Sequence, residues 1–177
     1  MVAKTELAMR FTGKAILALD RVIPATCIVR NELNGWRQAD QIVRTHGSTV
    51  PHGIPYQPRP FPPGQWNITN VSDMDADTEF WPRWIGTEAY QTLDAWILDD
   101  RGRYLCPYDF TIVGRGYGLH HARYRKDDVM VPSNTTLGCI NILKPDDSKW
   151  LAMKVREFLG YRLPVFIDVP EWNEWEA

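Results

Sequence analysis

Prolines are the feature that most restricts the fold of this 177-residue chain, which contains thirteen of them. Six lie between residues 48 and 64. A proline inside a helix removes a backbone hydrogen bond and clashes with the preceding turn, and a central strand rarely accepts one. We therefore expect this segment to be an ordered loop held against the body by its aromatic residues. Together with eight tryptophans, the prolines favour a β-rich domain with rigid turns over a helical bundle.

Strand patterns occupy much of the remaining chain. Apolar, β-branched runs at residues 15–19 and 27–29 predict strands, with Pro24 as a break between them. Residues 65–71 alternate between apolar and polar side chains, which is the period of a half-buried strand. Residues 94–105 predict a hairpin. The middle of the chain is therefore expected to be sheet.

Only one segment, residues 146–160, has the pattern of a helix. Acidic residues and a serine begin it, and Gly160 is placed to take the left-handed conformation at its end. Its apolar positions at helical spacing are Leu151, Val155, Phe158 and Leu159. A short strand at residues 163–167 and an acidic, tryptophan-bearing tail at residues 170–177 follow. The fold class predicted is mainly β (β-rich α+β), in one domain over residues 1–177.

Charge and hydropathy exclude several classes of function. The net charge is −2, so the chain lacks the basic surplus needed to neutralise a nucleic-acid backbone. Residues 15–19 form the longest apolar run, which is too short to span a membrane. Residues 1–10 lack the pattern of a signal peptide, so we expect synthesis in the cytoplasm and delivery by another route. No cysteine or histidine spacing indicates a metal site, and no cofactor is expected.

The three cysteines are an odd number, so at least one thiol should be free. Cys27 and Cys106 have the sequence surroundings of small buried hydrophobic residues. Cys139 differs, because Gly138 before it leaves room for a substrate. A cysteine attacks carbonyl groups as a thiolate, and a histidine nearby can take its proton. Cys139 is therefore predicted to be a nucleophile, with its own amide and neighbouring amides binding the oxyanion that forms.

The histidine pair His120 and His121 is the candidate base. It follows an apparent strand and precedes Cys139 by a loop long enough to fold back on itself. From these residues alone, two simpler interpretations remain open: a structural cysteine and a solvated histidine pair.

The two stretches resemble the signature of the L,D-transpeptidase (YkuD) family, which is Gly-hydrophobic-His-Gly followed by Ser/Thr-His-Gly-Cys-hydrophobic-Asn/Arg. This chain has Gly-Leu-His-His at residues 118–121 and Thr-Leu-Gly-Cys-Ile-Asn at residues 136–141. Residues 62–68 resemble the family's turn and strand, and residues 146–167 its closing helix and strand. The resemblance covers roughly residues 60–168. It implies a β-sandwich or barrel with one helix in the C-terminal half.

The resemblance also implies roles for individual residues. Cys139 would be the nucleophile and His120 its base, with Gly138 completing the catalytic group. The implied substrate contacts come from Tyr117, His121, Thr136, Leu137 and Asn141. The chain departs from the family at two of these positions: Leu137 replaces a histidine and His121 replaces a glycine. His121 could partly replace the missing imidazole, or it could be an exposed loop residue.

The implied reaction is acyl transfer on a peptidoglycan stem peptide, at a diaminopimelate or similar residue, with release of the terminal D-alanine. An amine acceptor gives transpeptidation and water gives carboxypeptidase activity, and the sequence does not choose between them. Delivery by a phage particle or a secretion system would make a phage tail or secretion-system protein a partner, with action in the cell wall or periplasm, or in the virion. The alternative is a catalytically impaired fold that serves as a structural or binding component of an assembly. Leu137 would then reflect the loss of catalysis, and the tail would dock on a partner. An unrelated cysteine hydrolase is a third possibility.

Overall fold

The computed structural model describes residues 4–30, 60–92 and 110–176, together with the backbone of four short strands between residues 37 and 56. The predicted hairpin at residues 94–105 and Cys106 lie outside the described residues. The strands are β1 (Leu7–Phe11), β2 (Ala15–Ala18), β3 (Arg21–Thr26), β4 (Arg37–Ala39), β5 (Ile42–Arg44), β6 (Thr49–Val50), β7 (Ile54–Tyr56), β8 (Gly64–Asp73), β9 (Arg83–Thr92), β10 (Phe110–His120), β11 (Arg123–Lys126), β12 (Val129–Pro132), β13 (Ile140–Ile142) and β14 (Val165–Val169). The helices are α1 (Pro145–Gly160) and the 3-10 turn η3 (Trp172–Glu174).

Eight of these strands close into a barrel-like sheet, in the order β13-β3-β2-β1-β14-β8-β9-β10, and a further pairing joins β10 to β13. Two pairings are parallel, β1 with β14 and β10 with β13, and the others in the ring are antiparallel. The prediction of a β-rich sandwich or barrel with one helix is confirmed. Closure matters for the site, because it brings β13 beside β10.

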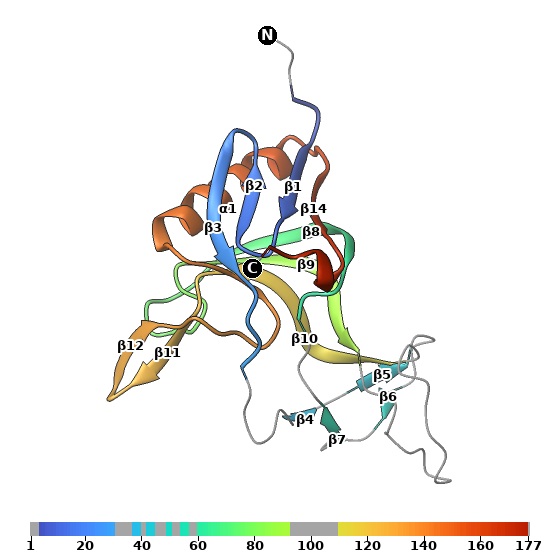
Figure 1. Ribbon diagram of the computed structural model, residues 1–177, viewed down its shortest axis with the longest axis vertical. Coiled ribbons are helices and arrows are strands. Elements are labelled where there is room, and N and C mark those ends of the chain that lie inside the picture. The colour runs from blue at the N-terminus through green and yellow to red at the C-terminus, as the bar shows by residue number, and fades with distance from the viewer. Residues whose placement is uncertain are drawn as a thin grey trace.

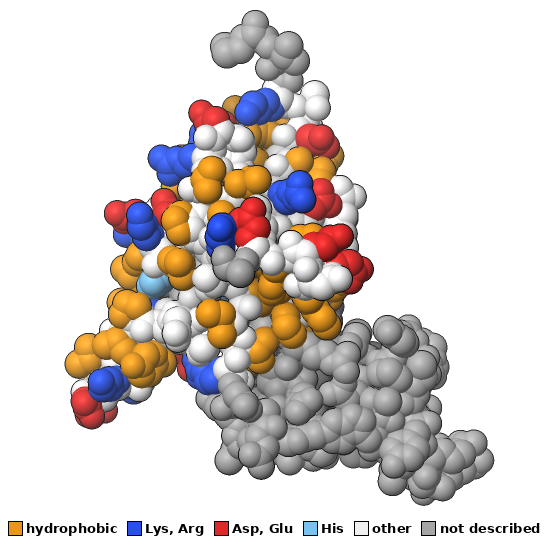
Figure 2. Space-filling view, in the orientation of Figure 1, with side chains coloured by type: hydrophobic (Ala, Val, Ile, Leu, Met, Phe, Trp, Pro, Cys, Tyr) orange, Lys and Arg blue, Asp and Glu red, His pale blue; other side chains and the backbone are white. Residues whose placement is uncertain are grey.

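A hairpin formed by β11 and β12 projects from the barrel (Figure 1). Figure 2 shows hydrophobic side chains along this hairpin and charged side chains at its tip; Tyr124 and Val129 are among the exposed apolar residues. No helix in the described part of the chain is both long enough and apolar enough to cross a membrane.

The core is built from strand residues that alternate inward. In β1, for example, Leu7, Met9 and Phe11 are buried and the residues between them are exposed. Helix α1 contacts β8, β9, β13 and β14 and adds its apolar side to the same cluster. Its buried members there are Leu151, Ala152, Val155 and Phe158. Burying a large apolar side chain stabilises the fold by roughly 2 kcal/mol, so this helix is held mainly by its packing on the sheet.

The predicted helix is confirmed, with differences at both ends. Pro145 occupies the first turn, where its missing N–H costs nothing, and Asp146 and Asp147 place negative charge beside the positive end of the helix dipole. At the other end the left-handed residue is Arg162 (φ 57°), not Gly160. The N–H of Leu163 then bonds back to the carbonyl of Phe158, which completes a Schellman-type end two residues later than predicted.

The sequence suggested that Pro24 breaks the first strands, but the structure shows no break at this residue. It lies inside β3, paired with Ala15 of β2. It donates no hydrogen bond, but its carbonyl accepts the N–H of Leu143, so the ladder continues toward β13. The proline-rich segment at residues 48–64 also contains two short strands, β6 and β7, in place of an unbroken loop.

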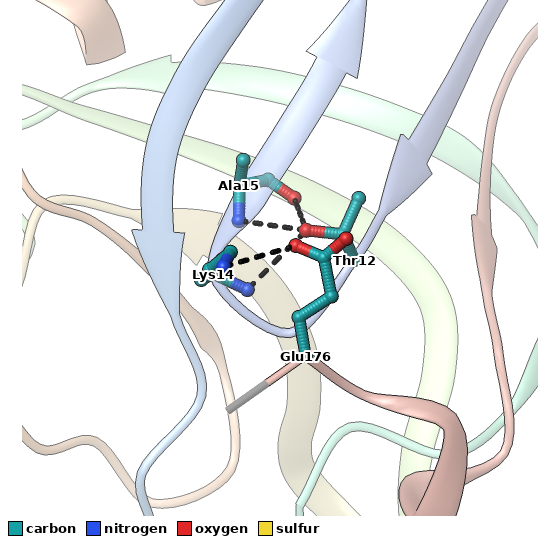
Figure 3. Close-up of polar contacts among 4 residues, drawn as sticks. All are labelled: Thr12, Lys14, Ala15 and Glu176. Atoms are coloured by element: carbon teal, nitrogen blue, oxygen red, sulfur yellow. Dashed lines mark hydrogen bonds and ion pairs between the residues drawn. The ribbon is translucent and has the colours of Figure 1, made fainter.

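The C-terminal tail is attached to the body of the same chain. The Glu176 N–H donates to the carbonyl of Thr12. The Glu176 carboxylate lies 3.7 Å from the amine of Lys14 (Figure 3). The edge of the Trp175 ring meets Phe11 at 5.0 Å between centroids. Gly13 makes this possible, because its φ is +101° and a Cβ there would lie 2.6 Å from the Cβ of Trp175. These contacts attach Trp175 and Glu176 to β1 and the turn that follows it.

Candidate active site

The parallel pairing of β10 and β13 makes the two predicted catalytic residues diagonal neighbours, because His120 lies opposite Asn141, two residues after Cys139. Leu119 faces Ile140 across this pair, and both are fully buried in the core. Side chains alternate along a strand, so His120 at the end of β10 and Cys139 just before β13 turn to the opposite face. Both line a cavity of about 510 Å³ on that face. The barrel therefore brings together residues nineteen positions apart in the sequence.

The Cys139 thiol is held by a backbone amide. Its Sγ accepts the Gly118 N–H at 3.4 Å. Burial raises the pKa of the Cys139 thiol to about 11, and the hydrogen bond from Gly118 opposes this rise. The thiol is therefore protonated at neutral pH.

His120 is a neutral imidazole with an assigned tautomer. Its Nδ1 lies 3.2 Å from the carbonyl oxygen of His121, and since a carbonyl only accepts, Nδ1 carries the proton and Nε2 is left as the basic nitrogen. Burial lowers the pKa of His120 to about 4. The described residues show no hydrogen bond between Cys139 Sγ and either imidazole. The resting site thus combines a neutral thiol with a neutral base.

Two aromatic rings form the wall behind His120. Phe80 meets the imidazole edge to face at 4.9 Å, and Trp84 lies 5.4 Å away at a tilt of 33°. Trp84 is the direct cross-strand partner of His120 between β9 and β10. Both rings line the cavity. They exclude water from the imidazole and so account for its lowered pKa.

The loop before Cys139 is fixed by the Thr136 hydroxyl. This hydroxyl accepts the Gly138 N–H at 3.1 Å and donates to the Cys139 carbonyl at 2.7 Å. Gly138 has a φ of +122°, a backbone conformation that favours glycine. A serine or threonine at position 136 therefore shapes the turn that presents the nucleophile.

Of the other predicted residues, Tyr117, Thr136 and Leu137 line the cavity, whereas Gly138, His121 and Asn141 do not. His121 is not the exposed loop residue considered above, since only 3% of it is accessible and its Nδ1 lies 2.9 Å from the carbonyl of Ile142. Asn141 is buried, and its side chain accepts from the Ala122 N–H and donates to the Ser133 carbonyl. These two residues brace the loop between β10 and β13.

Sequence reasoning missed several cavity residues, including Phe80, Trp84, Arg30, Arg123 and Asn70. Arg123 stacks on Trp81 at 4.7 Å and donates to the carbonyls of Ala76 and Thr78, so it ties the segment before β9 to the projecting hairpin. The density of aromatic residues at positions 80–84 was the one available signal. It does not reveal which of them meets His120.

Comparison with known proteins gives a single result. A family model described as the L,D-transpeptidase catalytic domain (YkuD) matches residues 34–167, about three quarters of the chain. Searches of the curated proteins and of the solved structures found no match.

Proposed function

Because the chain belongs to the YkuD family of L,D-transpeptidase catalytic domains, a family of peptidoglycan enzymes, we propose that it is a cysteine acyl-transfer enzyme acting on peptidoglycan stem peptides. The observation that carries this proposal is the meeting of Cys139 and His120 on the wall of one cavity, at the ends of two paired strands. The cell wall, which contains this substrate, is the place of action.

The first step is attack on the carbonyl carbon of the third stem residue, a diaminopimelate or similar residue. As the S–C bond forms, the thiol proton of Cys139 passes to Nε2 of His120. A neutral thiol beside a neutral imidazole suits this coupled transfer, because neither group needs to be charged before the substrate arrives. The carbonyl oxygen becomes an oxyanion, which the Cys139 N–H and neighbouring amides stabilise.

Collapse of the tetrahedral species breaks the C–N bond to the terminal D-alanine. The leaving amine takes the proton from His120, and a thioester remains on Cys139. An acceptor amine or water then attacks the thioester and gives its proton to His120, and Cys139 leaves as a thiolate that recovers the proton. The amine produces a cross-link or an exchanged D-amino acid, and water produces a shortened stem.

The test is incubation with purified tetrapeptide muropeptides, followed by mass spectrometry. The wild type should release D-alanine and yield a tripeptide or a cross-linked dimer. Cys139→Ala and His120→Gln should abolish both products. Met153→Ala, which changes an exposed side chain of α1, is the control and should turn over substrate like the wild type. Unchanged muropeptides with the wild type would overturn the enzymatic proposal.

A second candidate is a non-catalytic module of the same fold that binds within a larger assembly. Leu137 favours it, because this cavity residue is apolar where the family signature has a histidine. Retained binding of muropeptides without any product would support this candidate. Products from the wild type would exclude it.

A further inference from the structure

Cys27 contacts the loop that presents Cys139. It lies immediately after β3, and its Sγ is 3.1 Å from the carbonyl oxygen of Gly138. A carbonyl only accepts, so the thiol is the donor. The same sulfur accepts the Phe61 N–H at 3.5 Å, which is a second contact that holds it in place. Burial raises the pKa of Cys27 to about 12, so this proton is retained at neutral pH.

This contact determines how the peptide between Gly138 and Cys139 is turned. In a planar trans peptide the carbonyl and the N–H point in opposite directions. The Gly138 carbonyl points to Cys27, so the Cys139 N–H points away from Cys27. Cys139 lines the cavity and Cys27 does not. Because β13 lies between β3 and β10, the Cys139 N–H is directed to the β10 side, where Tyr117 and His120 line the cavity.

We propose that Cys27 is a positioning residue, whose thiol holds the Gly138 carbonyl so that the Cys139 amide is ready to bind the oxyanion of the acyl-transfer step. The inference rests on the proposed function for the identity of the nucleophile. Cys27 lies before residues 34–167, the part of the chain that the family model matches. Removing the donor frees the peptide to rotate and weakens oxyanion binding without touching the nucleophile.

Two small reagents separate these effects. With p-nitrophenyl acetate, the Cys139 thiolate attacks the acetyl carbon and forms a tetrahedral oxyanion, which collapses with loss of p-nitrophenolate to leave an acetyl thioester. With iodoacetamide, the same thiolate displaces iodide from a saturated carbon, and no oxyanion forms. A positioning role therefore predicts a change in acylation but not in alkylation. Peptide mass mapping assigns each modification to Cys139.

The experiment compares Cys27→Ala, Cys27→Val and Cys27→Ser with the wild type in the full chain. Loss of the S–H donor in the alanine and valine variants should slow acetylation of Cys139 by about tenfold, while alkylation stays within about twofold. Cys27→Ser keeps a donor and should acetylate within about threefold of the wild type. The valine variant fills the volume if alanine leaves the fold unstable.

Acetylation that is unchanged in both donor-free variants would overturn the proposal. A parallel fall in acetylation and alkylation would overturn it as well, since that pattern indicates a general structural role. So would a wild type whose Cys139 is not acetylated. Because p-nitrophenyl acetate is not a cell-wall peptide, these results are independent of muropeptide turnover. A protein that acetylates as expected but leaves muropeptides unchanged would contradict the proposed substrate and retain the role of Cys27.

Discussion

The indole of Trp84 covers the backbone of Gly118 so closely that a Cβ on Gly118 would lie 2.6 Å from two ring carbons. Gly118 also donates its N–H to the sulfur of Cys139. The same indole lies against the imidazole of His120. One residue without a side chain therefore allows the aromatic wall and the nucleophile to approach the same point of β10.

Gly118→Ala should damage both stability and chemistry. The added methyl group must displace the Trp84 ring or the strand, which should cost about 1–3 kcal/mol in the free energy of unfolding. Muropeptide turnover should fall at least tenfold, because the amide that contacts Cys139 moves. Urea denaturation and product analysis measure the two effects. Gly160→Ala is the matched control: nothing lies within 4 Å of its Cβ position at the end of α1, and its stability should be equal or higher by up to about 1 kcal/mol. Similar values for the two variants would contradict the close packing of Trp84.

His120 should make stability depend on pH. An unfolded histidine takes up its proton below about pH 6.5, whereas His120 in the fold does so only below about pH 4. Between these values the unfolded chain binds more protons, so the free energy of unfolding falls as the pH is lowered. The stabilisation from keeping His120 neutral is fully present above pH 6.5, and the free energy of unfolding is about 3 kcal/mol lower at pH 4. Urea midpoints at pH 7 and 4.5 should therefore differ more for the wild type than for His120→Gln. Equal differences would show that His120 is not shielded in this way.

The Cys139 thiol should react as a weakly acidic group. Because burial raises its pKa to about 11, its alkylation by iodoacetamide should keep accelerating up to that pH, when the modification is mapped to Cys139. A cysteine in a short peptide, with a pKa near 8.5, is the reference and should level off about two pH units earlier. A plateau for Cys139 near neutral pH would instead indicate a thiolate paired with a charged imidazole.

Leu137 should limit the rate of the proposed reaction. It lines the cavity two residues before Cys139, where the family signature has a histidine. Leu137→His adds a donor at this point, and we expect kcat for muropeptides to rise about tenfold. Leu137→Met conserves the volume without adding a donor and should leave kcat unchanged. A lower kcat with histidine would mean that the apolar side chain is itself needed.

The tail should contribute to stability mainly through Trp175. Its ring packs on Phe11 at the edge of the core, so Trp175→Ala should lower the free energy of unfolding by roughly 2 kcal/mol. The Lys14 and Glu176 pair is more than half exposed, and Lys14→Ala should cost less than about 1 kcal/mol. Thermal denaturation of the two variants measures the difference. A larger loss of stability in Lys14→Ala than in Trp175→Ala would contradict the main role given to Trp175.

Local patterns in the sequence predicted α1 well, because its acidic first turn and apolar spacing act within a few residues of one another. The helix ends at Gly160 as predicted, but the left-handed residue is Arg162, where the N–H of Leu163 bonds back to Phe158. The Cys139 and His120 site was predicted from its resemblance to a short sequence signature. The wall formed by Phe80 and Trp84 was not, because it depends on the register between β9 and β10. Nothing near Trp84 in the sequence indicates that it faces His120.

Strand β14 lies between β1 and β8 in the ring, although it is the last strand of the described chain. During synthesis, one edge of β1 and one edge of β8 therefore stay unpaired until residues 165–169 have emerged from the ribosome. Only then can the ring close. Cys139 and His120 lie on strands that pair without β14, so the edges of β1 and β8, and not the catalytic pair, are the places on a nascent chain where a chaperone would be needed.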